Sequence, residues 1–130
     1  MQDIIQSRHD AMYTEEQKRN IWEKGRAVDN YNPQMFRKDA CGAWIMWDKF
    51  GDQDSIYGWE IDHILPQSLG GPDIPDNMRP LQHQNNASKG NDYPSYTAVI
   101  TSDGNKNIEA VRHLVVNEEI RKKLKQYERD

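Results

Sequence analysis

Residues Trp59 to Gly90 read W-E-I-D-H-I-L-P-Q-S-L-G-G-P-D-I-P-D-N-M-R-P-L-Q-H-Q-N-N-A-S-K-G, and this stretch decides how the chain is interpreted. Near its start an acid and an imidazole, Asp62 and His63, stand side by side in an apolar run. Burying either group is costly unless it has a charge, a hydrogen bond or a metal as its partner. The pair therefore indicates a functional site rather than an ordinary strand.

The same stretch predicts two short strands followed by a helix. Residues 59–65 have the residue types of a strand. The Gly70-Gly71-Pro72 segment is typical of a loop, after which residues 78–81 return as a second strand. From about Gln82 a helix is expected to run to Lys89, with Gly90 as its left-handed terminator.

Asp62 and His63 are suited to two different steps in the hydrolysis of a phosphodiester. Successive side chains leave a strand on opposite faces, so the two should diverge. The reaction needs a base for the attacking water on one side of phosphorus and a cation for the leaving oxygen on the other. We predict His63 as the base and Asp62 as a metal ligand. Asn86 and Lys89 are three residues apart, hence on one helix face, and are expected to face Asp62.

The motifs D-H-I-x-P, G-G, N-x-x-x-L and N-x-x-K occur here in order, and the set resembles the His-Asn-His (HNH) nuclease family in a His-Asn-Asn form. The resemblance implies a ββα-metal core in which Asp62 and Asn86 bind the metal. His63 would be the general base, and Asn77 would help to hold the active-site loop and that base. Lys89 would lie close to the substrate phosphate.

The metal implied is Mg²⁺ or Mn²⁺. Carboxylate and amide oxygens suit these hard cations, whereas Zn²⁺ prefers His and Cys. The chain lacks the paired Cys-x-x-Cys motifs that bind structural zinc in many relatives, since Cys41 is its only cysteine. We therefore expect no structural zinc and no intramolecular disulfide, which favours a reducing, cytoplasmic location.

Two further residues of the stretch are candidates for the site. Glu60 should lie on the same strand face as Asp62, but a charge at the edge of the ladder is the favoured interpretation. His83 shares a helix face with Asn86 and could contact substrate or be structural. The basic run at 121–125 is typical of a solvated helix face, with DNA contact as the alternative.

Length and composition bound the remaining expectations. A chain of 130 residues predicts a single domain, 1–130, with its core motif at 58–90. Only 35% of residues are apolar, but four Trp and six Tyr predict an aromatic core. No stretch approaches the roughly 18 apolar residues of a membrane span. The net charge of −4 is unfavourable for general affinity for phosphates, so binding to nucleic acid needs local patches, a metal or a partner.

The flanking segments predict an α+β fold, with helices at both ends and a hairpin. A capping box at Thr14 predicts a helix over 14–28, and Asn117 is expected to cap a C-terminal helix. The apolar segment 43–47 is either a buried strand, which we favour, or a short turn of helix. The expected hairpin joins residues 96–101 to 108–116 through a turn at 102–105.

The sequence is compatible with two functions. The first is a metal-dependent DNA endonuclease that acts on double-stranded DNA and nicks as a monomer. Cutting both strands would need a second protomer or two events, and a homodimer or a protein partner is possible. The second, which the acidic composition favours, is a non-catalytic nucleic-acid or protein interaction module on an HNH scaffold. A His base and oxygen ligands favour the enzyme, because a scaffold needs neither.

Overall fold

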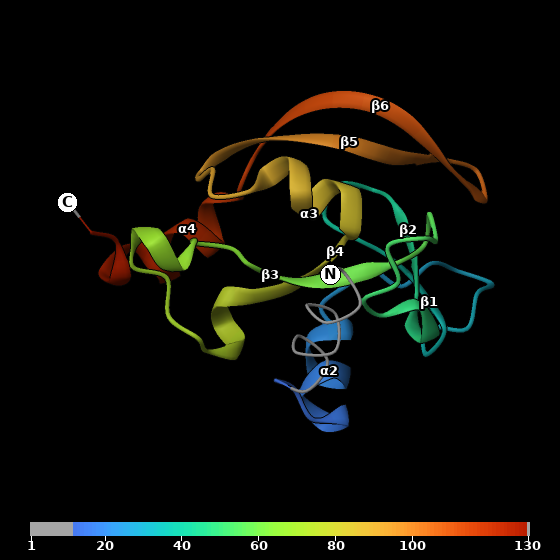
Figure 1. Ribbon diagram of the computed structural model, residues 1–130, viewed down its shortest axis with the longest axis horizontal. Helices are drawn as coiled ribbons and strands as arrows, with labels where there is room; N and C mark the ends of the chain where they lie inside the picture. Colours follow the sequence, from blue (N-terminus) through green and yellow to red (C-terminus); the bar gives the residue numbers. More distant parts are fainter. Residues whose placement is uncertain (1–11, 130) are drawn as a thin grey trace.

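The computed structural model describes residues 12–129, in which helices combine with small antiparallel sheets (Figure 1). The helices and strands are α2 (Glu15–Trp22), β1 (Phe36–Lys38), β2 (Trp44–Met46), β3 (Trp59–His63), β4 (Met78–Gln82), α3 (His83–Lys89), β5 (Ser95–Asp103), β6 (Lys106–Val115) and α4 (Glu118–Leu124). Each sheet has two strands, paired β1 with β2, β3 with β4, and β5 with β6. The predicted α+β class is confirmed. Within residues 12–129, no helix has the length and apolar character to cross a membrane.

The predicted strand, loop, strand and helix of the central stretch are present as β3, β4 and α3. The antiparallel register places Asp62 opposite Arg79 and His63 opposite Met78. Helix α3 follows β4 without a loop because the Gln82 side chain caps it, accepting hydrogen bonds from the first free amides of the helix. Gly90 ends the helix with a φ of 51°, which glycine adopts without steric cost.

The N-terminal helix is shorter than expected. Thr14 forms the predicted capping box with Gln17, but α2 ends at Trp22 instead of continuing to residue 28. The reason lies outside the helix, since Arg26 and Lys38 exchange backbone hydrogen bonds of 2.8 and 2.9 Å. This long-range pairing draws the chain after the helix into an extended conformation.

The segment 43–47 forms a strand, as favoured. Residues 44–46 pair with β1, and Trp47 then starts a turn of 3-10 helix. Ala43 and Ile45 are fully buried. The apolar character of this segment therefore reflects burial within a sheet rather than one face of a helix.

The predicted aromatic core is confirmed on one side of the β3–β4 sheet. Trp22 and Trp59 are both fully buried, with ring centroids 5.2 Å apart. Trp47 and Phe50 complete the group, with centroids 5.9 and 4.7 Å from that of Trp59. A second, mostly aliphatic cluster lies between β4, the hairpin and α4; its buried members are Cys41, Ile64, Leu65, Leu81, Tyr96, Ala98, Val116 and Leu124.

The C-terminal hairpin is present and longer than predicted. Strands β5 and β6 arch over α3 (Figure 1), and the Asn85 side chain joins the helix to β5. Its amide oxygen accepts hydrogen bonds from the amides of Val99 and Ile100, and its nitrogen donates to the Ile100 carbonyl. As predicted, Asn117 caps α4 by accepting from the amide of Ile120. The hairpin thus fixes the position of α3 over β3.

Candidate active site

Asp62 lies between two basic side chains. Its Oδ2 is 2.9 Å from Nε of Arg79, its cross-strand neighbour, and its Oδ1 is 3.2 Å from Nζ of Lys89 on α3. The carboxylate is only 4% exposed. A buried charge needs such partners, and the two cations provide them here.

Lys89 is buried against oxygen atoms of the protein. Its ammonium is 3.0 Å from the Ile64 carbonyl and 3.4 Å from that of His63, in addition to Asp62. Burial lowers the pKa of Lys89, and Asp62 acts in the opposite direction. Its side chain has no exposed surface, so the predicted contact with a substrate phosphate is not part of this arrangement. What Lys89 does here is tie α3 to the end of β3.

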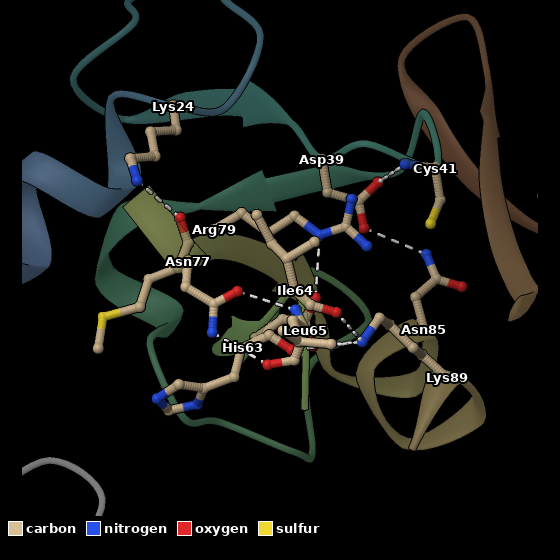
Figure 2. A network of polar contacts seen from close by, with 12 residues as sticks. Lys24, Asp39, Cys41, His63, Ile64, Leu65, Asn77, Arg79, Asn85 and Lys89 are labelled. Atoms are coloured by element: carbon tan, nitrogen blue, oxygen red, sulfur yellow. Dashed lines mark hydrogen bonds and ion pairs between the residues drawn. The ribbon is translucent and has the colours of Figure 1, made fainter. Parts of the chain in front are cut away.

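His63 points away from this buried network. Figure 2 shows its ring directed away from Arg79 and Lys89, so Asp62 and His63 diverge as predicted. Its Nε2 lies 2.9 Å from Oδ1 of Asp73. In the tautomer that donates its Nε2 proton to this carboxylate, Nδ1 carries the lone pair that a general base needs.

Asp73 contacts the candidate base, and the sequence did not reveal this contact. It stands ten residues after His63, in the loop between β3 and β4, and its contact depends on the path of that loop. Only the turn signal at residues 70–72 hinted that the chain folds back there. A carboxylate on the second ring nitrogen orients an imidazole and stabilises its charged form.

Asn77 holds the loop between the two strands. It is fully buried, its Oδ1 accepts from the Leu65 amide at 2.8 Å, and its Nδ2 donates to the carbonyls of Leu65 and Pro72 at 3.0 Å. The loop is so tight that a Cβ on Gly71 would lie 1.7 Å from the Leu65 oxygen. Asn77 thereby fixes the loop that carries Asp73, while its effect on catalysis stays a prediction.

Asn86 shares a pocket with the two central residues. Asp62, His63 and Asn86 line a cavity of about 370 Å³ together with Ile61, Pro66, Gln67, Ser68, Gly90 and Asn91. The Asn86 Nδ2 donates to Glu60 Oε1 at 2.9 Å, so the amide oxygen is turned away from that carboxylate. The structure therefore brings together the predicted base and both predicted metal ligands, with Glu60 beside them.

His83 lies apart from this pocket. Its Nε2 is 2.9 Å from the Ser55 carbonyl, and its backbone amide donates to the Gly58 carbonyl at 3.0 Å. Both contacts tie the start of α3 to the loop before β3. This position suits the structural alternative considered for His83.

The oxygen donors of the pocket fit a hard divalent cation. Mg²⁺ is usually held by one or two carboxylates and keeps several waters. Asp62 and Asn86 provide a carboxylate and an amide oxygen, and a carboxylate in two ion pairs still has lone pairs to offer. Within residues 12–129 no three His, Cys, Asp or Glu side chains cluster where they could hold a metal ion. Arg79 and Lys89 oppose the charge of an incoming cation, so we expect modest affinity.

The comparison with known families agrees with the motif. Residues 52–95 match the model of an HNH endonuclease family, and the matched segment contains all of β3, β4 and α3. No curated protein and no solved structure matches the chain. The match supports a nuclease function for the segment that carries the candidate site.

Proposed function

We propose that this chain is a single-domain, metal-dependent DNA endonuclease whose catalytic unit is the β3–β4–α3 segment, a ββα-metal core. The observation that carries the proposal is the shared pocket of Asp62, His63 and Asn86, which lies within the segment matched by the HNH endonuclease model. Each of the three supplies a type of group that phosphodiester hydrolysis requires.

His63 is the proposed general base. Its Nδ1 accepts the proton of a water molecule that attacks phosphorus, and Asp73 on Nε2 keeps the ring oriented and stabilises the imidazolium that forms. Asn77 serves this step indirectly, because its hydrogen bonds fix both ends of the loop that holds Asp73.

Asp62 and Asn86 are the proposed ligands of Mg²⁺ or Mn²⁺. When bound there, such an ion would act as a Lewis acid toward the phosphoryl group and the departing 3′ oxygen, and the product would carry a 5′ phosphate. Arg79 and Lys89 hold the Asp62 carboxylate in place through the two ion pairs. Lys89 is thus proposed to act by holding Asp62. A direct contact with the substrate phosphate would require the Lys89 ammonium to leave this position.

One pocket of this kind cuts one strand, so the monomer is proposed to nick double-stranded DNA. Cutting both strands requires a second protomer, a protein partner or two separate events. The net charge of −4 gives the chain no general attraction to DNA, which makes the local site and the metal central to substrate binding.

The test is incubation of the purified chain with supercoiled plasmid in Mg²⁺, in Mn²⁺ and in EDTA. We expect open circles to accumulate in either metal and no cleavage in EDTA. Conversion of supercoiled plasmid directly to the linear form would contradict nicking by a monomer. Cleavage that persists in EDTA would contradict the metal requirement.

The alternative is a non-catalytic binding module. The observation that favours it is the engagement of both Asp62 oxygens by cations, an arrangement that would also suit a purely structural ion pair. Under this alternative the chain binds DNA or a protein with no turnover in any divalent metal, which the plasmid assay and a gel-shift assay distinguish.

A further inference from the structure

A larger cavity, separate from the candidate active site, lies between β4, the loop after β1 and the C-terminal segments. Its volume is about 820 Å³, and Asp62, His63 and Asn86 do not line it. Pockets for small organic ligands commonly have about 300–1,000 Å³. Binding of a ligand in this cavity would not depend on nuclease activity.

The lining of this cavity is strongly basic. Six basic side chains contribute to it, namely Lys24, Arg26, Lys38, Arg79, Arg112 and Lys123, against the two acids Asp39 and Asp76. The oxygens of Asp39 are already engaged, since they accept hydrogen bonds from the amides of Cys41, Ala43 and Gln82 and from the Asn85 side chain. The cavity therefore has an excess of positive charge that favours an anion.

Two buried guanidinium nitrogens of this lining have no hydrogen-bond acceptor among residues 12–129, although the Tyr96 ring lies 5.2 Å from the Arg79 guanidinium carbon. They are Nη2 of Arg79 and Nε of Arg112. Arg79 is only 7% exposed and uses its Nε for Asp62, and Figure 2 shows its guanidinium on the side of Asp39 and Cys41, which also line the cavity. A buried charged donor without an acceptor is costly, so an acceptor from a ligand would remove the cost.

Cys41 does not offset this positive charge. Burial, and secondly the nearby Asp39, raise the pKa of its thiol to about 12. At neutral pH the thiol is uncharged, so it neither pairs with the guanidinium groups nor repels an anion.

Most of the remaining lining is apolar. Its members include Ile64, Met78, Tyr96, Leu114, Val116 and Ile120. A bare phosphate would leave this surface unused, whereas an anion with an organic body would cover it.

We propose that this cavity binds a small organic phosphate of nucleotide size. The phosphate accepts hydrogen bonds from Arg79 and Arg112, which suit phosphate oxygens because charge-assisted bonds of this kind are the strong ones. The organic body packs against the apolar lining, and lysines at the mouth, including Lys123, add attraction.

Titration calorimetry in EDTA tests the proposal without involving cleavage, with AMP, inorganic phosphate and adenosine as probes. We expect AMP to bind about tenfold or more tightly than phosphate, and adenosine to bind least. Arg112→Gln should weaken AMP binding at least about tenfold, the equivalent of one charge-assisted hydrogen bond. Lys123→Gln, at an exposed position that carries little folding risk, should weaken it about threefold.

The matched controls are Arg121→Gln and Lys122→Gln, which remove exposed charges on α4 outside the cavity lining. They should leave AMP affinity within about twofold. The proposal is overturned if AMP does not bind at millimolar concentration, or if the controls weaken it as much as the cavity variants do. Equal affinities for AMP and phosphate would show that the apolar lining does not contact an organic group. Binding of a DNA duplex without binding of AMP would show that the cavity binds nucleic acid and not a small ligand.

Discussion

Arg79 and Asp62 face each other across the β3–β4 sheet, with Nε of the arginine 2.9 Å from Oδ2 of the aspartate. Lys89 contacts the other carboxylate oxygen, so one buried acid serves two buried cations. Removing the acid would leave both cations without their anion, whereas removing one cation would leave an ion pair. Asp62 is therefore expected to matter for folding as well as for metal binding.

Asp62→Ala is expected to lower the free energy of unfolding by about 3–5 kcal/mol, the usual cost of breaking a buried ion pair. Urea denaturation measures this. Asp54→Ala, at an exposed position, is the control and should change stability by less than about 0.5 kcal/mol. Adding Lys89→Met to Asp62→Ala should recover part of the lost stability. If the double variant loses as much stability as the two single variants together, Asp62 and Lys89 are not coupled.

Asn77→Ala is expected to cost about 2 kcal/mol or more, because it leaves the buried amide of Leu65 and its carbonyl without their partner. Thermal and urea unfolding measure this loss. Asn20→Ala, on the exposed face of α2, should change stability by less than about 0.5 kcal/mol. Similar stability of the two variants would show that the loop does not depend on Asn77.

Asp73→Ala is expected to slow cleavage by about 10- to 100-fold, because the imidazole of His63 loses the group that orients it. The effect should fall on kcat and leave DNA affinity in a gel-shift assay unchanged, as expected for a positioning residue. Asp76→Ala, in the same loop but without contact to His63, is the control for this assay. A change in affinity with kcat intact would place Asp73 in substrate binding instead.

Cys41 is expected to resist thiol reagents in the folded protein. It is 1% exposed, and burial raises the pKa of its thiol to about 12, so almost none of the reactive thiolate is present at pH 8. Labelling with iodoacetamide should be slow in buffer and fast in urea. Fast labelling of the folded chain would show that the segment around Cys41 opens readily.

Local sequence signals predicted most of the central unit, and long-range contacts account for the rest. Strand alternation predicted that Asp62 and His63 diverge, and helical spacing placed Lys89 toward Asp62. Arg79 and Asp73 were missed because each depends on strand register or loop path, which residue spacing does not encode. The predicted end of α2 was also wrong because of a long-range contact. The backbone pairing of Arg26 with Lys38 overrides the local helical pattern.

The most direct test of the central claim compares plasmid cleavage in Mg²⁺ by the native chain, His63→Ala and His113→Ala. His113 is an exposed imidazole on the hairpin, with its Nδ1 3.2 Å from the Thr97 hydroxyl, and so controls for loss of a histidine. We expect His63→Ala to reduce the cleavage rate about 10²- to 10⁴-fold, the usual contribution of a general base, and His113→Ala to leave it unchanged. Cleavage by folded His63→Ala at the native rate would contradict the account.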